Sequence, residues 1–172
     1  MSLGSSGSSI SPALITGTLI LVAGAVDDMR SRKFHNWLFI TLTICAVVIS
    51  VATGGWLALN TSLLGFAAAV VAFLPLVLIR IIGAGDLKLL AAFGAAVGWS
   101  TVIDVAILSL LWGAIFGVIQ IVIKGQFVPM LKNLAAITRL EDRQKLTLHT
   151  IPFTIAIFFS WLTHLVQTGV LK

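Results

Sequence analysis

Apolar residues fall into six runs along the chain, separated by short polar segments. The runs cover approximately residues 12–26, 37–52, 57–82, 86–99, 102–123 and 151–165, and the second ends at the sequence TGGW. A helix that crosses a bilayer needs about 20 residues, so the 172 residues suffice for roughly six of them. The fourth run is short and rich in Ala and Gly, which is typical of a helix packed inside a bundle. The pattern predicts a bundle of about six transmembrane helices.

Composition supports a membrane protein of the all-α class. Hydrophobic residues make up 59% of the chain and charged residues 10%, with a mean hydropathy of +1.11. A soluble domain is about 45–50% apolar and about 25% charged. We therefore expect an integral membrane protein with a flexible Ser/Gly-rich tail over residues 1–11 and a single transmembrane domain over residues 12–172.

The basic residues predict the orientation in the membrane. Ten of the eleven lie at the ends of the first, third and fifth runs or in the segments that follow them: Arg30, Arg32, Lys33, Arg80, Lys88, Lys124, Lys132, Arg139, Arg143 and Lys145. Lys and Arg gather on the cytoplasmic side of membrane proteins. We thus predict a multi-pass protein of the cytoplasmic (inner) membrane with both termini outside. The net charge of +5 then reflects membrane anchors in contact with lipids rather than binding to nucleic acid.

The long segment 124–149 carries apolar residues at three- and four-residue intervals. This spacing predicts an amphipathic helix on the cytoplasmic membrane surface, between the fifth and sixth helices. It is either a connector resting on lipid or a surface that helps to admit a membrane-bound substrate. The apolar positions are Phe127, Met130, Leu131, Leu134, Ile137 and Leu140.

Cysteine and histidine usage argues against metal and disulfide chemistry. Cys45 is the only cysteine, so an internal disulfide and a four-cysteine zinc site are excluded, and its apolar surroundings suggest a small buried hydrophobe. His35, His149 and His164 have no metal-ligand spacing. No G-x-G-x-x-G sequence suggests a nucleotide cofactor. We expect neither a metal nor a cofactor.

The carboxylates at two predicted helix ends are the candidate catalytic groups. Asp27 and Asp28 end the first run, and Asp86 begins the fourth within IRIIGAGDLKLL. The predicted topology brings both ends to the cytoplasmic face at similar depth. Two carboxylates a few ångströms apart hold one shared proton. The ionised member can take a proton from water while the protonated member donates to a scissile carbonyl or leaving amine. A pair of carboxyl groups that shares one proton is suited to peptide hydrolysis.

The residues around Asp86 also allow a purely structural interpretation. Gly83 and Gly85 permit unusual dihedral angles and close approach of another chain, and Asp86 can cap the helix that follows. Lys88 can stabilise charge in the site or extend to lipid phosphates. In the first polar segment, Asn36 can cap the second helix or order the loop near Asp28.

Three segments of the sequence resemble motifs of the type IV prepilin peptidases. GAGDLKLLAAFGA, at residues 83–95, resembles the GxGD signature of that family, including the Lys two residues after the Asp. DDMRSRKFHNWL, at residues 27–38, resembles the first aspartate motif, which in the compact tight-adherence pilus branch has the form D-x-R-x-x-x-I-P-N. TIPF, at residues 150–153, is similar to a Pro-Phe pair that opens the last helix of the family.

Aligning the first motif with this chain selects Asp28, Arg30 and Asn36. Asp27 is then a neighbour of the motif aspartate. Phe34 and His35 replace the Ile-Pro of the motif, which leaves the choice between Asp27 and Asp28 open.

The resemblance implies an aspartic endopeptidase that removes the basic leader of pilin-like precursors at the cytoplasmic membrane edge. It implies Asp28 and Asp86 as the catalytic pair, with Gly83, Gly85, Lys88, Arg30 and Asn36 in support. Larger members carry a cysteine-bearing insertion after the first helix and also methylate the new N-terminus. This chain lacks that insertion, so we predict a peptidase without methyltransferase activity. The oligomeric state stays open.

Three other interpretations compete with this one. A presenilin-like GxGD intramembrane protease would carry its first aspartate in a Tyr-Asp pair, but the chain contains no Tyr. A small ion or proton carrier could bind cations with Asp28 and Asp86, although such pathways usually place acids near the bilayer midplane. In a structural subunit the aspartates would only cap helices, and Asn would be tolerated at both positions.

Overall fold

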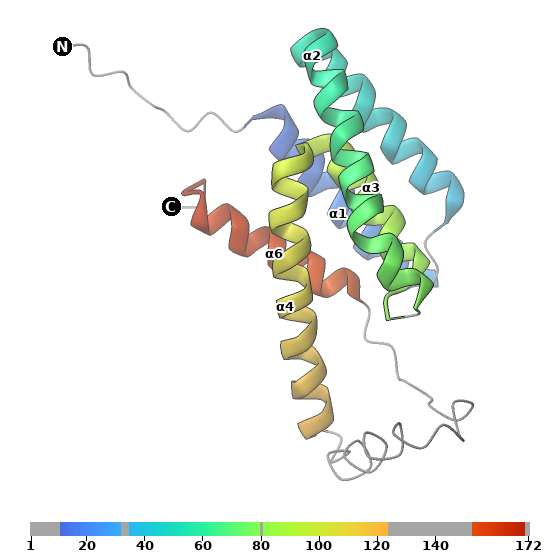
Figure 1. The fold of residues 1–172 in the computed structure, drawn as a ribbon, viewed down its shortest axis with the longest axis vertical. Coiled ribbons are helices and arrows are strands. Elements are labelled where there is room, and N and C mark those ends of the chain that lie inside the picture. The colour runs from blue at the N-terminus through green and yellow to red at the C-terminus, as the bar shows by residue number, and fades with distance from the viewer. Residues whose placement is uncertain (1–10, 32–34, 80, 124–152, 171–172) are drawn as a thin grey trace, which may run out of the picture.

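The computed structural model describes residues 11–31, 35–79, 81–123 and 153–170, and the structure in these ranges is helical without any strand (Figure 1). This confirms the predicted all-α class. The tail at residues 1–10 and the predicted amphipathic helix at 124–149 lie outside the described residues. The helices are α1 (Pro12–Ser31), α2 (Asn36–Leu78), α3 (Ala84–Val97), α4 (Trp99–Ile123) and α6 (Phe153–Gln167).

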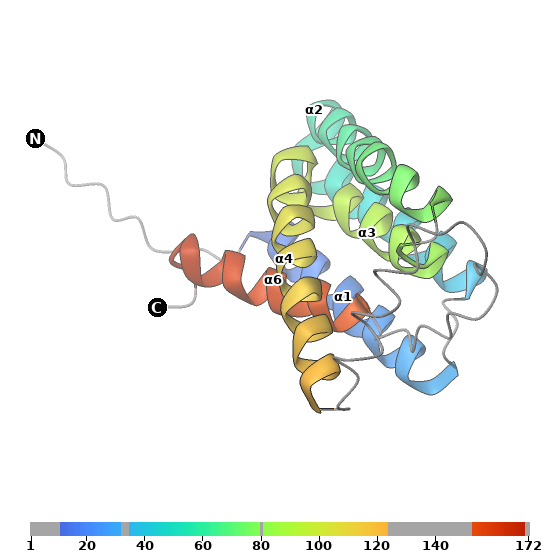
Figure 2. The same cartoon turned by 60° about the horizontal axis from the view of Figure 1, so that its bottom comes forward.

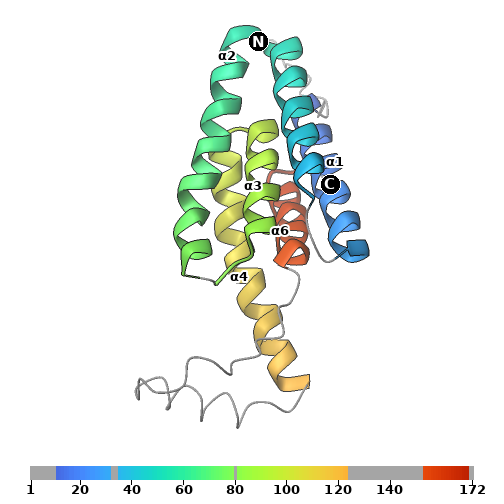
Figure 3. The same ribbon diagram turned by 90° about the vertical axis from the view of Figure 1, so that its right-hand side faces the viewer.

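Helix α2 consists of two arms that meet at Gly55. This residue has φ 61° and ψ −148°, a conformation that glycine adopts far more readily than residues with a Cβ. The arms run side by side in opposite directions, so α2 is a helical hairpin (Figure 3). The break lies within TGGW, where the second apolar run was expected to end. With the arms counted separately, the described residues form six helical segments at the positions of the six runs.

Among the described residues, two elements are long and apolar enough to cross a membrane. They are Asn36–Leu78 and Trp99–Gln120, with mean hydropathies of 2.3 and 2.4, and only 22% of each apolar window is buried inside the bundle. An outward surface this apolar suits contact with lipid and would be a liability in water. These helices support a membrane protein, while the number of crossings and their orientation stay predictions. Cys45 of α2 is exposed on this surface, so the expectation of a buried cysteine is wrong.

Helix α3 forms the centre of the bundle. Its residues from Leu89 to Ala96 are all buried. A Cβ on Gly94 would overlap the backbone carbonyl of Gly65 in α2, and the reverse is also true, so glycine at both positions allows the two backbones to touch. At about 1.5 Å per residue, α3 is roughly 21 Å long and too short to cross the hydrocarbon core alone.

Three helix ends meet at one end of the bundle. Figures 2 and 3 show the carboxyl end of α1 near the amino ends of α3 and α6, with α4 extending beyond them. This is the arrangement that the order of the runs predicted for α1 and α3. It brings together the polar residues that end α1 and begin α3.

Candidate active site

Asp28 and Asp86 both contact one buried hydroxyl group. Thr154 Oγ1 is 3.0 Å from Asp86 Oδ1 and 3.3 Å from Asp28 Oδ2. Asp86 Oδ1 and Asp28 Oδ2 are therefore no farther apart than the sum of these two distances. The structure thus brings together two aspartates that are 58 positions apart in the sequence, as their places at helix ends predicted.

Helix packing explains why Asp28 faces Asp86. Gly17, Gly24 and Asp28 are spaced by seven and four residues, so they share one face of α1. A Cβ on Gly17 would lie 2.6 Å from the Val97 side chain, and one on Gly24 would overlap Leu89, so this face packs directly against α3. The two helices run in opposite directions, and one further turn along α1 places Asp28 at the start of α3.

Asp27 points to a different partner. Its Oδ2 accepts a hydrogen bond from the backbone N–H of His35 at 3.1 Å, and its Oδ1 lies 3.0 Å from His35 Nδ1. Successive residues of a helix point about 100° apart, so neighbouring aspartates cannot share one face. Asp27 therefore holds the start of α2, whereas Asp28 contacts Thr154.

The first turn of α3 positions Asp86. Gly83 is the N-cap residue, and Asp86 lies three positions later, where an acidic side chain can bond back to the N-cap backbone N–H. A Cβ on Gly83 would lie 3.2 Å from Asp86 Oδ2, so this glycine allows a close approach. The expectation of unusual dihedrals is wrong, because Gly83 has φ −72° and Gly85 lies within α3 without a positive φ. An ordinary extended N-cap residue is sufficient to start this helix.

The environment of Asp86 favours its protonated form. Asp86 lies outside both candidate membrane spans, in the first turn of α3. Burial raises the pKa of its carboxyl from 3.8 to about 6, and the nearby charge of Asp28 adds to this. Hydrogen bonds from the Thr154 side chain and from the backbone of Gly83 and Thr154 oppose part of the increase. A carboxyl with this pKa exchanges its proton near neutral pH, as a proton-sharing pair requires.

Lys88 and Asn36, both predicted to support the site, bind each other. Lys88 Nζ donates a hydrogen bond of 2.6 Å to Asn36 Oδ1 and joins α3 to the start of α2. The N-cap residue of α2 is His35, so the interpretation of Asn36 as a capping side chain is wrong. Its amide oxygen is occupied by the ammonium group. Arg30 is exposed in the last turn of α1, and within the described residues no hydrogen bond or ion pair joins it to the two aspartates.

Thr154 is the residue that the sequence did not reveal. It lies in the first turn of α6 and is only 5% exposed. The available signal was the TIPF sequence just before it, which predicted a helix start at the cytoplasmic end of the bundle. A hydroxyl-bearing residue directly after that start could have been placed beside the aspartates.

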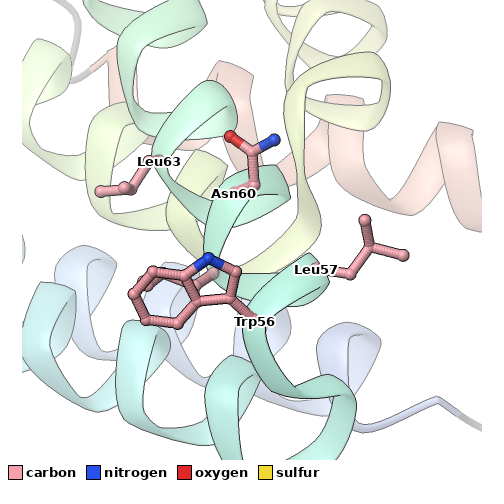
Figure 4. Close-up of a pocket in the computed structure, with 5 residues that line it drawn as sticks. Trp56, Leu57, Asn60 and Leu63 are labelled. Carbon is pink, nitrogen blue, oxygen red and sulfur yellow. The ribbon is translucent and has the colours of Figure 1, made fainter.

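A hollow lies at the end of the bundle opposite the aspartates, beside the bend of α2 (Figure 4). Its volume is about 520 Å³, and Asn60 is the only polar side chain in its lining. The other lining residues are apolar: Trp56, Leu57, Leu59 and Leu63. None of the described residues that line this hollow is a carboxylate. Within the described residues, no group of three or more His, Cys, Asp or Glu could hold a metal ion.

Comparison with known proteins identifies the family of this chain. Residues 15–118 match the type IV leader peptidase family. This match covers more than half of the chain and includes Asp28 and Asp86, and it ends before α6. No curated protein and no solved structure matches the chain. The predicted resemblance is confirmed at this level: the chain belongs to the type IV leader peptidase family.

Proposed function

We propose that the protein is a membrane-embedded aspartic endopeptidase that removes the leader peptide of type IV prepilin-like precursors. Asp28 and Asp86 form its catalytic pair. The observation that carries the proposal is the contact of both carboxylates with the same buried hydroxyl group, at an end of the bundle where three helix ends meet. Family membership supports the reaction class, since it indicates a peptidase.

The chemistry assigns a different role to each aspartate. Asp28 is the general base: its carboxylate takes a proton from a water molecule, whose oxygen attacks the scissile carbonyl carbon. Asp86 is the general acid, because its raised pKa keeps a proton available to pass to the leaving amine as the C–N bond breaks. Like charges this close cannot both ionise easily, which supports one proton for the pair.

The membrane arrangement follows from the charge pattern. In our proposal one domain, over residues 12–172, crosses the inner membrane about six times with both termini outside, and the aspartates face the cytoplasm. A basic leader would remain on that side while the hydrophobic helix of the precursor lies in the bilayer. The apolar outward surfaces of α2 and α4 support contact with lipids. As for the compact tight-adherence pilus branch, we propose no methylation of the product.

Other residues support the pair indirectly. The Lys88–Asn36 contact fixes the start of α2 against α3, and Lys88 lies two residues after Asp86. Gly83 allows the close approach to Asp86, and Gly85 completes the first turn of α3. Because Asp28 and Asp86 lie at helix ends, the geometry disfavours an ion carrier with carboxylates in the middle of a span.

The test is cleavage of a co-expressed type IV prepilin, measured by its decrease in size. Asp28→Asn and Asp86→Asn should each abolish cleavage, while the neighbouring variant Asp27→Asn is the matched control and should remain active. All variants are compared at equal abundance in the membrane. Full activity of both Asp28→Asn and Asp86→Asn would exclude the aspartic mechanism. An inactive Asp27→Asn with an active Asp28→Asn would show that the wrong neighbour had been assigned.

A further inference from the structure

The hydroxyl group of Thr154 contacts two carboxylate oxygens but has only one proton to donate. A threonine hydroxyl has one hydrogen to donate and two lone pairs that accept. It lies within 3.3 Å of an oxygen of each carboxylate, yet it can donate to only one of them. Both contacts are satisfied as hydrogen bonds only when one carboxyl is protonated and donates to Thr154, while Thr154 donates to the other.

We propose that Thr154 is a positioning residue that carries the shared proton between Asp86 and Asp28. The inference rests on the proposed function and extends it to a third helix. The family match ends at residue 118, so it does not assign any role to α6.

The two oxygens of the Asp86 carboxyl have different neighbours. A Cβ on Gly83 would lie 3.2 Å from Oδ2, whereas Oδ1 lies 3.0 Å from Thr154 Oγ1. A proton on Oδ1 can therefore be donated to the threonine hydroxyl, whose lone pairs accept.

The threonine can restore the pair after each cleavage. During the reaction Asp28 gains one proton from water, and Asp86 loses one to the leaving amine. Asp28 then gives its proton to Thr154 Oγ1, and at the same time Thr154 gives its own hydroxyl proton to Asp86 Oδ1. One proton has moved from Asp28 to Asp86, and Thr154 is unchanged. Because Thr154 is 5% exposed, this transfer is sheltered from water.

Substitution of the hydroxyl group tests the role. Thr154→Val removes the donor but keeps a β-branched side chain of similar size, and Thr154→Ser keeps the hydroxyl. In the prepilin cleavage assay, Thr154→Val should lower kcat about 10- to 100-fold with little change in KM, since positioned proton transfer contributes on the order of 10²–10⁴-fold. Thr154→Ser should recover most of the loss.

Thr16→Val is the matched control. Thr16 is also buried, at 8% exposure, but its Oγ1 donates to the Pro12 carbonyl oxygen at the far end of α1. This variant should retain the activity of the wild-type protein. Thermal unfolding of each variant shows that it is folded.

The pH profile separates a proton-carrying role from a structural one. Thr154 stabilises the state with one shared proton, so its hydroxyl should widen the pH range of activity. Thr154→Val should narrow the bell-shaped profile from both sides, and Thr154→Ser should not. A loss of kcat with an unchanged width would indicate a structural role only and would overturn the inference, as would wild-type kcat in Thr154→Val.

Asp28→Asn and Asp86→Asn, assayed in parallel, distinguish failure of the inference from failure of the proposed function. If they are inactive while Thr154→Val behaves as Thr16→Val does, the function stands and the inference fails. If the wild-type protein cleaves no prepilin tested, thermal unfolding against pH provides the second measurement. A Thr154 hydroxyl that only donates to the ionised Asp86 lowers the pKa of Asp86, so its loss would raise the midpoint of this titration. A hydroxyl that stabilises the shared proton keeps that proton bound, so under the proposal Thr154→Val should lower the midpoint. An unchanged or raised midpoint overturns the inference.

Discussion

Within α3, the eight residues from Leu89 to Ala96 are all buried, whereas those from Gly85 to Lys88 are only partly so. The buried part is apolar and touches the backbone of α2 through Gly94. The first turn is held by hydrogen bonds and carries a carboxylate beside a second one. Helix α3 thus combines a buried part, which fixes its position in the bundle, with a first turn in which the charged form of Asp86 lowers the stability of the protein. The buried part of α3 can therefore keep Asp86 in place although the charge of Asp86 is unfavourable there.

The largest effect is expected in the rigid region. Gly94→Val would place a Cβ against the Gly65 carbonyl, and backbone has no alternative rotamer with which to move away. We expect a loss of several kcal/mol, because overpacking alone costs about 1–3 kcal/mol where side chains can adjust. Membrane abundance and thermal unfolding in detergent measure it.

Gly117→Ala in α4 is the control for this substitution. Nothing lies within 4 Å of a Cβ at Gly117, so this variant should be as stable as the wild-type protein or slightly more so. A stable Gly94→Val protein would show that the contact between α2 and α3 can relax. The buried part of α3 would then not be the rigid region that holds Asp86 in place.

The next largest effect concerns the folding stability that the protein loses because Asp86 is buried. Its pKa is raised from 3.8 to about 6, so its contribution to folding is full below pH 4 and is lost as the pH rises through 6. At neutral pH the cost amounts to at most about 3 kcal/mol, at 1.36 kcal/mol per pKa unit. Asp86→Asn should therefore unfold several degrees above the wild-type protein at pH 8 and at the same temperature at pH 4, although it should not cleave prepilin.

Asp104→Asn is the control, since Asp104 is an exposed carboxylate on α4. Asp104→Asn should not raise the unfolding temperature at pH 8 as Asp86→Asn does. If Asp86→Asn were less stable than the wild-type protein at pH 8, the charged carboxylate would be contributing to stability as a helix cap. The charged Asp86 in the first turn of α3 would then not destabilise the protein.

The smallest effect is expected at the contact between Lys88 and Asn36. This hydrogen bond links the partly exposed start of α3 to an exposed residue of α2. A double-mutant cycle with Lys88→Met and Asn36→Leu should give a coupling energy of about 0.5–1.5 kcal/mol, the usual range for a net hydrogen bond in a protein. Unfolding free energies in detergent supply the four values. A coupling of zero would mean that packing alone fixes the start of α2.

Much of the fold could be predicted from the sequence because its signals are local. Apolar runs predict the helices, and the Gly-Gly pair in TGGW predicts the bend at Gly55, where a side chain would be strained. The places of Asp28 and Asp86 at helix ends follow from the same runs. In retrospect, the spacing of Gly17, Gly24 and Asp28 on one helix face also indicated which aspartate faces α3.

Only the tertiary structure determined the contacts between distant helices. Asp27 and Asp28 are chemically identical, and their partners depend on how α1 is rotated by its packing against α3. Thr154 lies 126 positions from Asp28, and its contact with both aspartates depends on where α6 enters the bundle. A sequence specifies helices through the local spacing of its residues. It specifies a shared site only through packing between helices, which no local pattern records.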